Sequence, residues 1–250
     1  MFEPQEYRYF EDVNWGLLRL WGERSGRDVL DVACGFATTA QHIQRGGNRV
    51  VGIDSSGDAV IVARRRIQQV IQVDLTKIDE VRDALNGRRF DTIIFADVLE
   101  HLPWPLVVLR SYFDFLKSDG TVIISLPNVA LWSVRLAHLF GRFNYEETGV
   151  LDRTHLRFFT RRTALRLIDD AGLVPERCTY NPGLVRPMVP LAKRILAGRR
   201  GGEKVDSDAL LNSRPYRLYL KTIYPIERAV ARLWPSALAF QMIFETRRKP

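Results

Sequence analysis

The chain has 250 residues, of which 46% are hydrophobic and 26% charged, a composition typical of a globular protein and not of a disordered one. Its formal net charge of +8 is unevenly spread, since residues 1–180 carry 23 basic and 24 acidic side chains whereas residues 181–250 carry 14 basic and 5 acidic. A protein that coats nucleic acid would be basic throughout, so this distribution argues against that class.

The sequence also argues against membrane-spanning and secreted classes. It contains no run of about 18 apolar residues free of charge and proline, so a transmembrane helix is not expected. The first residues, Met1 to Glu6, are acidic and lack the apolar core of a signal peptide. Cys34 and Cys178 are the only cysteines, too few for a disulfide framework or a cysteine-based zinc site. We therefore expect a cytoplasmic protein.

Five short, β-branched apolar runs alternate with helix-like segments in the first half of the chain. They cover residues 29–33, 49–54, 70–74, 91–96 and 121–126. Continuous apolar runs of this length are typical of strands covered on both faces, and helical spacers between them indicate parallel βαβ units. The pattern predicts an α/β fold with a doubly wound, mostly parallel sheet.

The second half of the chain completes this sheet. Residues 128–159 are expected to form a long connection, part helical and part extended. Thr160 is a typical N-cap for a helix that ends at Gly172, and residues 173–180 are predicted to form a sixth strand. Apolar residues then recur at helical spacing over 184–196 and 226–234, before a last apolar run at 238–244 that should return to the sheet as a seventh strand.

Four aspartates lie within or directly after the first four predicted strands. Asp31, Asp54, Asp74 and Asp97 are about one βα repeat apart. Ligands of open parallel sheets bind beyond the carboxyl ends of the strands, where a carboxylate after the second strand can accept hydrogen bonds from both hydroxyls of a ribose. Any one of these residues is explained as well by capping of the next helix, but all four together favour a ligand site.

The turn after the first strand narrows the kind of ligand. Residues 31–38 are mostly small, which lets a ligand approach the backbone. A dinucleotide site would need G-x-G-x-x-G, and this turn has only Gly35. Because Asp31 opens the turn, a ligand with an ammonium group fits better than a diphosphate, and S-adenosylmethionine has one.

These motifs resemble those of the class I S-adenosylmethionine-dependent methyltransferases. Residues 29–35 resemble their first motif, and residues 96–102 resemble the fourth-strand motif of the ubiquinone-type and related small-molecule enzymes. The resemblance covers roughly residues 27–180 and implies a seven-stranded Rossmann-like fold with S-adenosyl-L-methionine as the cofactor. It implies that the cofactor is bound by Asp31, Ala33, Cys34, Gly35, Asp54, Ser55, Asp74, Leu75, Ala96 and Asp97.

One residue departs from the family pattern. The family usually has glycine where this chain has Ala37, beside the methionine part of the cofactor. If the backbone there must have a positive φ, alanine is strained. A cofactor-binding protein without catalytic activity is therefore one interpretation of the sequence.

The segment 149–160 supplies the candidate catalytic and substrate-binding residues. It resembles a signature of bacterial methyltransferases that accompany glycan or natural-product biosynthesis. If residues 151–159 are extended, Arg153, His155 and Arg157 share one face, which places a general base beside two guanidiniums and suits an anionic acceptor. His101 is a second, weaker candidate for the base. The alternative is that His155 only hydrogen-bonds this loop to the turn after the fourth strand.

Asp97, Glu100 and His101 also form a D-x-x-E-H cluster. On a helical turn these side chains fall on one side, where they would be able to bind a divalent cation. The competing interpretation has Asp97 at the cofactor while Glu100 and His101 cap and pack the loop, and it predicts no metal. We adopt the second interpretation.

We predict one methyltransferase domain over 1–250, with a cofactor-binding core at 27–180, a basic helical insertion or lid at 184–236 and a final strand at 237–247. The apolar stripe of the insertion is expected to cover the core; peripheral membrane contact and a solvated face are the alternatives. We expect methyl transfer to a hydroxyl of a small molecule, such as a sugar, glycan precursor or natural-product intermediate. N-methylation of an amino sugar, tRNA or other nucleic-acid methylation, and a non-catalytic scaffold are the alternatives, with nucleic acid not expected.

Overall fold

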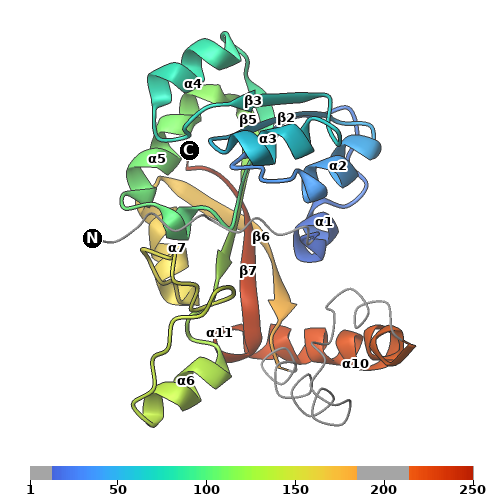
Figure 1. Ribbon diagram of the computed structural model, residues 1–250, viewed down its shortest axis with the longest axis vertical. Helices are drawn as coiled ribbons and strands as arrows, with labels where there is room; N and C mark the ends of the chain where they lie inside the picture. The colour runs from blue at the N-terminus through green and yellow to red at the C-terminus, as the bar shows by residue number, and fades with distance from the viewer. Residues whose placement is uncertain (1–12, 185–213, 250) are drawn as a thin grey trace.

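Seven strands form one sheet with helices on both faces (Figure 1). The computed structural model describes residues 13–184 and 214–249 of the chain. The sheet has the order β3-β2-β1-β4-β5-β7-β6. Its strands are β1 (Asp28–Val32), β2 (Arg49–Asp54), β3 (Gln69–Gln72), β4 (Phe90–Ala96), β5 (Leu116–Pro127), β6 (Leu173–Pro182) and β7 (Ala239–Arg248).

The topology confirms the predicted doubly wound, mostly parallel seven-stranded sheet. Strands β1 to β5 pair in parallel, and β7 runs antiparallel to both β5 and β6. The chain winds outward from β1 to β3, then returns to the other side of β1 with β4, so the strand order reverses between β1 and β4. The carboxyl ends of these two strands are where an open α/β sheet binds its ligand.

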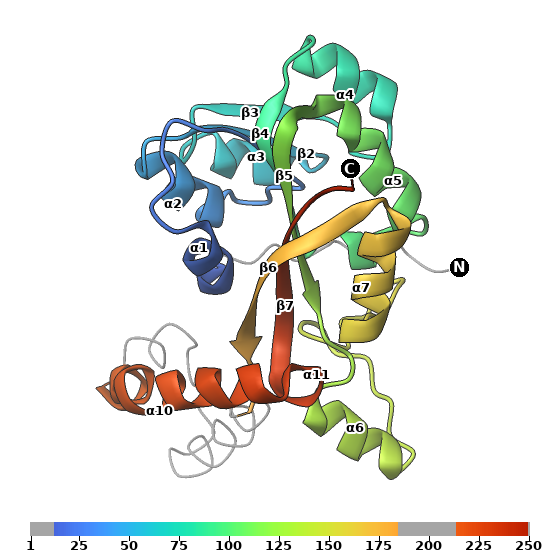
Figure 2. The ribbon, with the colours of Figure 1, turned by 180° about the vertical axis from the view of Figure 1, so that it is seen from behind.

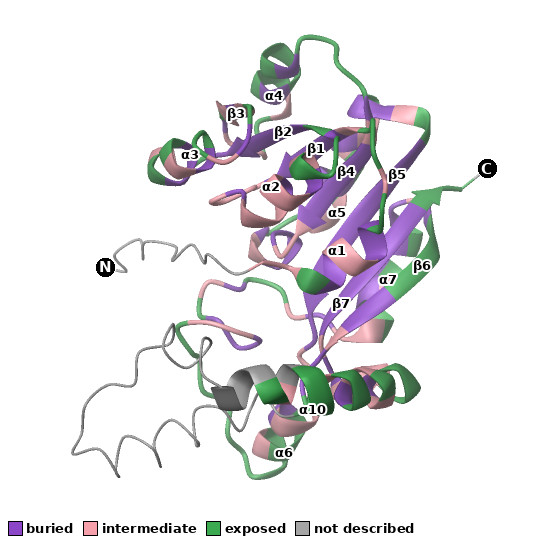
Figure 3. Cartoon of the chain, turned by 90° about the vertical axis from the view of Figure 1, so that its right-hand side faces the viewer, coloured by how far each residue is buried: buried purple, intermediate pink, exposed green. Residues whose placement is uncertain are grey.

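Helices from two parts of the chain cover opposite faces of the sheet (Figures 1 and 2). One apolar cluster joins the sheet to α1 (Trp15–Trp21), α2 (Thr38–Arg45) and α3 (Gly57–Ala63). A larger cluster joins the other face to α4 (Ile78–Leu85), α5 (Pro105–Ser111), η2 (Tyr112–Phe115) and α7 (Arg161–Asp170). The strands inside the sheet, β1, β2, β4, β5 and β7, are mostly buried, whereas the edge strands β3 and β6 carry exposed residues (Figure 3). Burial on both faces explains the continuous apolar runs of the inner strands.

Two helix starts show how local sequence sets the elements. The predicted N-cap Thr160 is confirmed, since its hydroxyl accepts from Thr163 N and the Thr163 side chain accepts from Thr160 N. Helix α1 was not predicted. Its signal in the sequence is Asn14, whose side chain caps the helix by accepting from Leu17 N at 3.0 Å, followed by apolar residues at helical spacing.

The connection after β5 differs from the expectation in its second part. Helix α6 (Trp132–Leu139) supplies the predicted helical portion. The predicted extended conformation of residues 151–159 is wrong, because residues 151–154 form turns held by hydrogen bonds to Asp152, whose Oδ1 accepts from both Thr154 N and Thr154 Oγ1. Side chains of 153, 155 and 157 therefore do not line up on one face.

The segment before β7 contains α10 (Arg214–Leu233) and α11 (Pro235–Leu238). The expectation that its apolar stripe faces the core is wrong: Ile226, Leu233 and Trp234 are exposed, whereas Ala231 and the acidic Glu227 are buried. The predicted helix at 184–196 falls almost entirely outside the described residues, and the division of the chain into core, insertion and final strand stays a prediction. No helix in the described ranges is long and apolar enough to cross a membrane.

Candidate functional site

The loop between β1 and α2 has an unusual backbone. Ala33, Gly35 and Ala37 have φ values of 57°, 52° and 56°. The loop is held by Cys34 N, which donates to Ile53 O at 3.0 Å, and by Ala37 N, which donates to Cys34 O at 2.8 Å. Repeated left-handed residues turn the chain sharply at the strand end and leave little bulk above it. Ala37 therefore has the positive φ at which alanine is strained and glycine is not.

Asp54 ties this loop to the end of β2. Its Oδ2 accepts from Gly35 N at 2.8 Å and its Oδ1 accepts from Ser56 N at 3.0 Å, and the residue is almost fully buried. One carboxylate therefore orients the turn after β1 and the turn before α3 together. Ser55, between them, is exposed at the same edge, where its carbonyl accepts from the side chain of Gln72.

Asp31 is buried beneath this loop. Burial, with the nearby Asp54 carboxyl as a second cause, raises the pKa of Asp31 to about 7. A buried carboxyl with this environment is stabilised in its charged form by an incoming cation. The ammonium group of S-adenosylmethionine is such a cation, so the electrostatics agree with the role expected for Asp31.

Cys34 is a packed residue and not a nucleophile. Its Sγ packs closely against Gly52 of β2, where an added Cβ atom would be only 2.7 Å from the sulfur. Burial, and then the Asp31 and Asp54 carboxyls, raise the pKa of the thiol. A thiol held in its neutral form does not act as a nucleophile at neutral pH.

The segment after β3 carries the third aspartate. Asp74 Oδ1 accepts from Thr76 N at 2.9 Å and from Thr76 Oγ1 at 2.7 Å, which forms a compact turn. The neighbouring Leu75 is half-buried, and its carbonyl accepts from the buried Tyr112 hydroxyl at 2.9 Å. Asp74 and Leu75 thus lie at the same sheet edge as Asp31 and Asp54, as the sequence predicted.

Asp97 follows Ala96 at the end of β4 and also has a positive φ, 54°. Its Oδ1 accepts from Ser125 Oγ at 3.0 Å and its Oδ2 accepts from Gln241 Nε2 at 2.5 Å. Gln241 Oε1 in turn accepts from Asn181, whose amide also donates to Asn14 at 3.2 Å. Sequence reasoning missed these partners of Asp97.

Glu100, His101 and His155 form a cluster after Asp97, in which Glu100 and His155 are buried and His101 is half-buried. The two imidazole rings are 4.8 Å apart in an edge-to-face arrangement, and His155 Nε2 is 3.9 Å from Glu100 Oε1. His155 Nδ1 lies 3.3 Å from Val150 O, while His101 Nδ1 lies 3.2 Å from Thr154 O. Two backbone donors, Leu156 N and Arg157 N, hold the loop to Glu100 O at 2.9 Å.

Burial decides the charge of this cluster. It lowers the pKa of His101 to about 4, with the adjacent His155 as the second cause, and it lowers the pKa of His155. Burial, followed by Asp97, raises the pKa of the Glu100 carboxyl well above its usual range. The uncharged forms of all three groups are favoured, so the contact between His155 and Glu100 is polar and not an ion pair at neutral pH.

The two arginines expected beside His155 have other partners. Arg153 pairs with Glu147, and Arg157 donates to Pro103 O at 2.7 Å and lies over the Trp104 ring. Both guanidiniums are exposed while His155 is buried. The prediction that His155 lies beside the guanidiniums of Arg153 and Arg157 is therefore wrong, because the turn at 151–154 directs the three side chains apart.

The groups that would be able to hold a metal ion also differ from the expected set. Within the described residues, ligand atoms of Glu100, His101 and His155 lie within 4.8 Å of one another. Asp97 is not part of that group, and its two oxygens accept hydrogen bonds from Ser125 and Gln241. One carboxylate and two imidazoles fit a zinc-like ion better than magnesium, and Glu100 Oε2 is buried without a hydrogen-bond partner.

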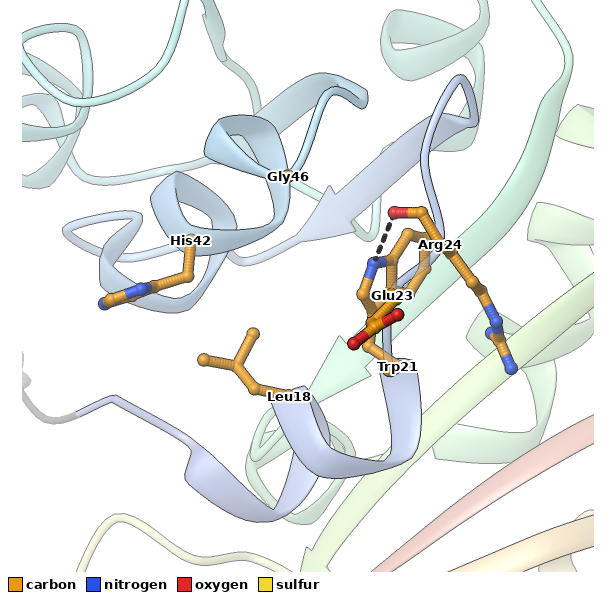
Figure 4. Close-up of a pocket in the computed structure, with 7 residues that line it drawn as sticks. Leu18, Trp21, Glu23, Arg24, His42 and Gly46 are labelled. Atoms are coloured by element: carbon orange, nitrogen blue, oxygen red, sulfur yellow. Dashed lines mark hydrogen bonds between the residues drawn. The ribbon is translucent and has the colours of Figure 1, made fainter.

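A cavity of about 360 Å³ lies away from this edge (Figure 4). It is lined by Leu18, Trp21, Gly22, Glu23, Arg24, His42 and Gly46. The Trp21 indole donates to Arg24 O at 3.3 Å, and the Arg24 guanidinium pairs with Glu245 at 2.7 Å. The cavity is bordered by the carboxyl-terminal half of α2, whereas the loop of Asp31 and Ala37 precedes that helix, so it is separate from the site of the aspartates.

One family model covers most of the chain. The family model described as a methyltransferase domain matches residues 5–177. A ubiquinone biosynthesis O-methyltransferase of Xanthomonas campestris pv. campestris is 28% identical over 162 residues, 60% of this chain and 67% of that protein. The enzyme of the same name from Pseudomonas aeruginosa is 27% identical over 191 residues, 71% of this chain and 80% of that protein.

Solved structures share the fold at lower identity. A SAM-dependent methyltransferase from Archaeoglobus fulgidus has a TM-score of 0.56 at 18% identity, over 92% of this chain and 90% of that one. A putative sarcosine dimethylglycine methyltransferase from Galdieria sulphuraria has a TM-score of 0.55 at 16% identity, over 91% of this chain and 79% of that one. These likenesses concern the fold alone.

Proposed function

The chain belongs to the class I S-adenosylmethionine-dependent methyltransferases, and from that premise we propose that it methylates a hydroxyl of a small molecule. S-adenosyl-L-methionine is the cofactor. The acceptor that we propose is a sugar, a glycan precursor or a natural-product intermediate. When bound, the cofactor supplies an electrophilic methyl group, and the residues of this chain bind it, orient the acceptor and take up a proton.

The proposed binding residues form one continuous edge. Asp31 would meet the ammonium group, Asp54 the ribose hydroxyls and Asp74 the adenine amine, while the loop around Gly35 leaves room for the methionine chain. Ala33, Cys34, Ser55, Leu75, Ala96 and Asp97 complete the proposed cofactor site. Positioning of this kind contributes up to about 7–11 kcal/mol to a bimolecular transfer.

The observation that carries a hydroxyl acceptor is the cluster of Glu100, His101 and His155. A hydroxyl must lose its proton as the methyl group arrives, whereas an amine needs less help from a base. His155 is held through Nδ1 near Val150 O, which leaves Nε2 as the candidate base, and burial favours its neutral form. The relatives named O-methyltransferases support the same choice.

The charge of the acceptor is a separate proposal. Arg153 and Arg157 remain candidates to contact it, although each has a partner within the chain. We propose an anionic acceptor because the basic excess of the chain lies in residues 181–250, which include the segment before β7. Peripheral contact with a membrane belongs to the same proposal, since an acceptor with an apolar tail would be collected at a lipid surface.

Substitution of His155 tests the role of the base. We expect His155→Ala to lower turnover on a hydroxyl acceptor by about 10²–10⁴-fold while the affinity for S-adenosylmethionine, measured by calorimetry, stays unchanged. His42→Ala is the matched control, because His42 packs on Trp15 and is not one of the proposed site residues. Unchanged turnover in His155→Ala would remove this residue from the mechanism.

The alternatives give different results in simple assays. An N-methyltransferase would methylate an amino sugar faster than its hydroxyl analogue and would be insensitive to His155→Ala. A nucleic-acid methyltransferase would retard an RNA in a gel shift, and the retardation would weaken steeply between two salt concentrations. A scaffold would bind the cofactor without turnover on any acceptor.

A further inference from the structure

Helices α6, α10 and α11 lie together at one end of the molecule (Figures 1 and 2). Several of their large apolar side chains are exposed. Leu233 is 86% exposed, Leu139 77%, Phe140 71% and Trp234 59%, and Leu136 is also exposed. We call these five residues the apolar tip. Isolated apolar residues are common on protein surfaces, but a contiguous group of this size marks a contact surface.

Three of the five tip residues line one cavity, and Leu233 and Phe140 are their neighbours in sequence. Leu136 and Leu139 of α6 share a cavity of about 350 Å³ with Trp234, at the junction of α10 and α11. Trp132 and Leu238 line the same cavity from the two sides. The Arg135 guanidinium donates to Ala130 O at 2.6 Å and to Ser236 O at 3.0 Å, which fixes α6 against α11.

In the part of the chain that the structure describes, the exposed charged side chains of α6 and α10 are all basic. Residues 132–145 include Arg135 and Arg142 and no acidic residue. Helix α10 contributes Lys221, Arg228 and Arg232, and its single acidic residue, Glu227, is buried and accepts from the Tyr219 hydroxyl at 2.5 Å. Helix α10 thus buries its carboxylate and exposes Leu218 and Leu233, the reverse of a helix that packs on a core.

We propose that the apolar tip docks on an anionic lipid bilayer. Its leucine, phenylalanine and tryptophan side chains would enter the boundary between headgroups and acyl chains, and the surrounding arginines and lysine would meet the lipid phosphates. Charge complementarity selects this partner: a surface that is apolar at its centre and cationic at its rim fits a negatively charged lipid layer.

The tip lies on the side of the sheet that carries the proposed site. Helix α6 follows the carboxyl end of β5, and α11 leads into β7 where Gln241 pairs with Pro127 of β5. Docking would bring the carboxyl ends of β4 and β5 toward the lipid, within reach of an acceptor anchored there. Only this last step rests on the proposed function, since docking itself requires no methyl transfer.

Sedimentation of the full chain with vesicles tests the proposal. We expect binding at least about tenfold stronger to vesicles of phosphatidylcholine with phosphatidylglycerol than to phosphatidylcholine alone, and weaker at high salt. The double substitution Leu233→Ser, Trp234→Ser should lower the affinity at least about tenfold. Ile61→Ser, at an exposed apolar position on α3, is the matched control and should leave binding unchanged.

A charge variant keeps the test decisive if the apolar variant does not fold. Arg142→Gln, Arg232→Gln should remove the preference for anionic vesicles, whereas Arg166→Gln on α7, whose side chain is 80% exposed, should not. Equal binding to neutral and anionic vesicles would overturn the proposal. A protein that is dimeric in solution and becomes monomeric on Leu233→Ser would also overturn it, because the tip would then be a contact between two copies of the chain. The affinity of the same variants for the cofactor should not change. Vesicle binding therefore reports on docking, and cofactor binding reports separately on the proposed function.

Discussion

Gln241, near the start of the last strand, donates from Nε2 to Oδ2 of Asp97 at 2.5 Å, across 144 residues of sequence. Asp97 has a left-handed backbone, and Ser125 of β5 donates to its other oxygen at 3.0 Å. A residue with a positive φ is kept in place only when its surroundings hold it. β5 and β7 therefore orient the carboxylate at the end of β4.

We predict that Gln241→Leu weakens cofactor binding. The substitution removes one hydrogen bond to a carboxylate, typically 1.5–3 kcal/mol or about 10–100-fold in affinity, and it also leaves Asn181 without this partner. Calorimetric titration with S-adenosylmethionine measures the effect, and the exposed Gln68→Leu serves as the control. An affinity equal to that of the wild type would show that Asp97 is held without Gln241.

The raised pKa of Asp31, about 7, predicts that cofactor affinity depends on pH. Pairing with the ammonium group needs the ionised carboxylate, so affinity should rise about tenfold per pH unit below 7 and level off above it. Calorimetry between pH 5.5 and 8.5 tests this. A flat profile in the wild type would mean that Asp31 does not pair with the ligand.

The same residue predicts a gain in stability when its charge is removed. Because the pKa of Asp31 is higher in the folded state than its ordinary value of 3.8, ionisation weakens folding progressively from about pH 4 to pH 7, by on the order of 4 kcal/mol. Asp31→Asn should therefore unfold at higher urea than the wild type at pH 8 and show little difference at pH 4. The opposite pH trend would contradict this account, as would tighter cofactor binding by the variant.

Position 37 tests whether alanine is tolerated where the family has glycine. The left-handed backbone disfavours Ala37 by about 1–2 kcal/mol, but its methyl group is buried in the cluster of α1, α2 and α3, worth about 0.8 kcal/mol. Ala37→Gly should thus change the free energy of unfolding by less than about 1.5 kcal/mol, whereas the β-branched Ala37→Val should lower it by about 3 kcal/mol. Urea titration separates these outcomes.

The cluster of Glu100, His101 and His155 predicts a response to metal ions. We expect turnover to survive exhaustive chelation, because the base in our proposal is a neutral imidazole. Added Zn²⁺ should inhibit, since it would bind the nitrogen lone pairs, and Glu100→Gln should reduce this inhibition. Loss of activity on chelation, restored by a divalent ion, would instead assign the cluster to a metal.

The fold, and the position of the four aspartates at the strand ends, followed from sequence because both depend on local patterns. Buried parallel strands have continuous apolar runs, and each aspartate comes at the end of one of them. The partners of Asp97 were missed although a signal existed: Ser125 and Gln241 are polar residues inside apolar strand runs, and both are buried. A buried polar residue inside an apolar strand needs a hydrogen-bond partner, and Asp97 is that partner for both Ser125 and Gln241.

The segment 151–157 and helix α10 show where local patterns fail. A period of two predicts a shared face only if the chain is extended, and the Asp152 side chain instead closes a turn around Thr154. The apolar spacing over 226–234 predicted a helix, and α10 is helical there. The spacing alone does not determine which face of the helix packs on the rest of the protein. Helix α10 contacts β6, which is far away in the sequence, and in this packing Glu227 is buried and Ile226 is exposed.

Calorimetric titration of Asp54→Asn with S-adenosylmethionine, beside Asp58→Asn, tests the central claim most directly. Asp54 holds Gly35 and Ser56 in position and is proposed to accept the ribose hydroxyls, whereas Asp58 is exposed one helical turn further on. We predict at least about tenfold weaker binding for Asp54→Asn and wild-type affinity for Asp58→Asn. Wild-type affinity in a folded Asp54→Asn protein would contradict a cofactor site at the acidic strand ends.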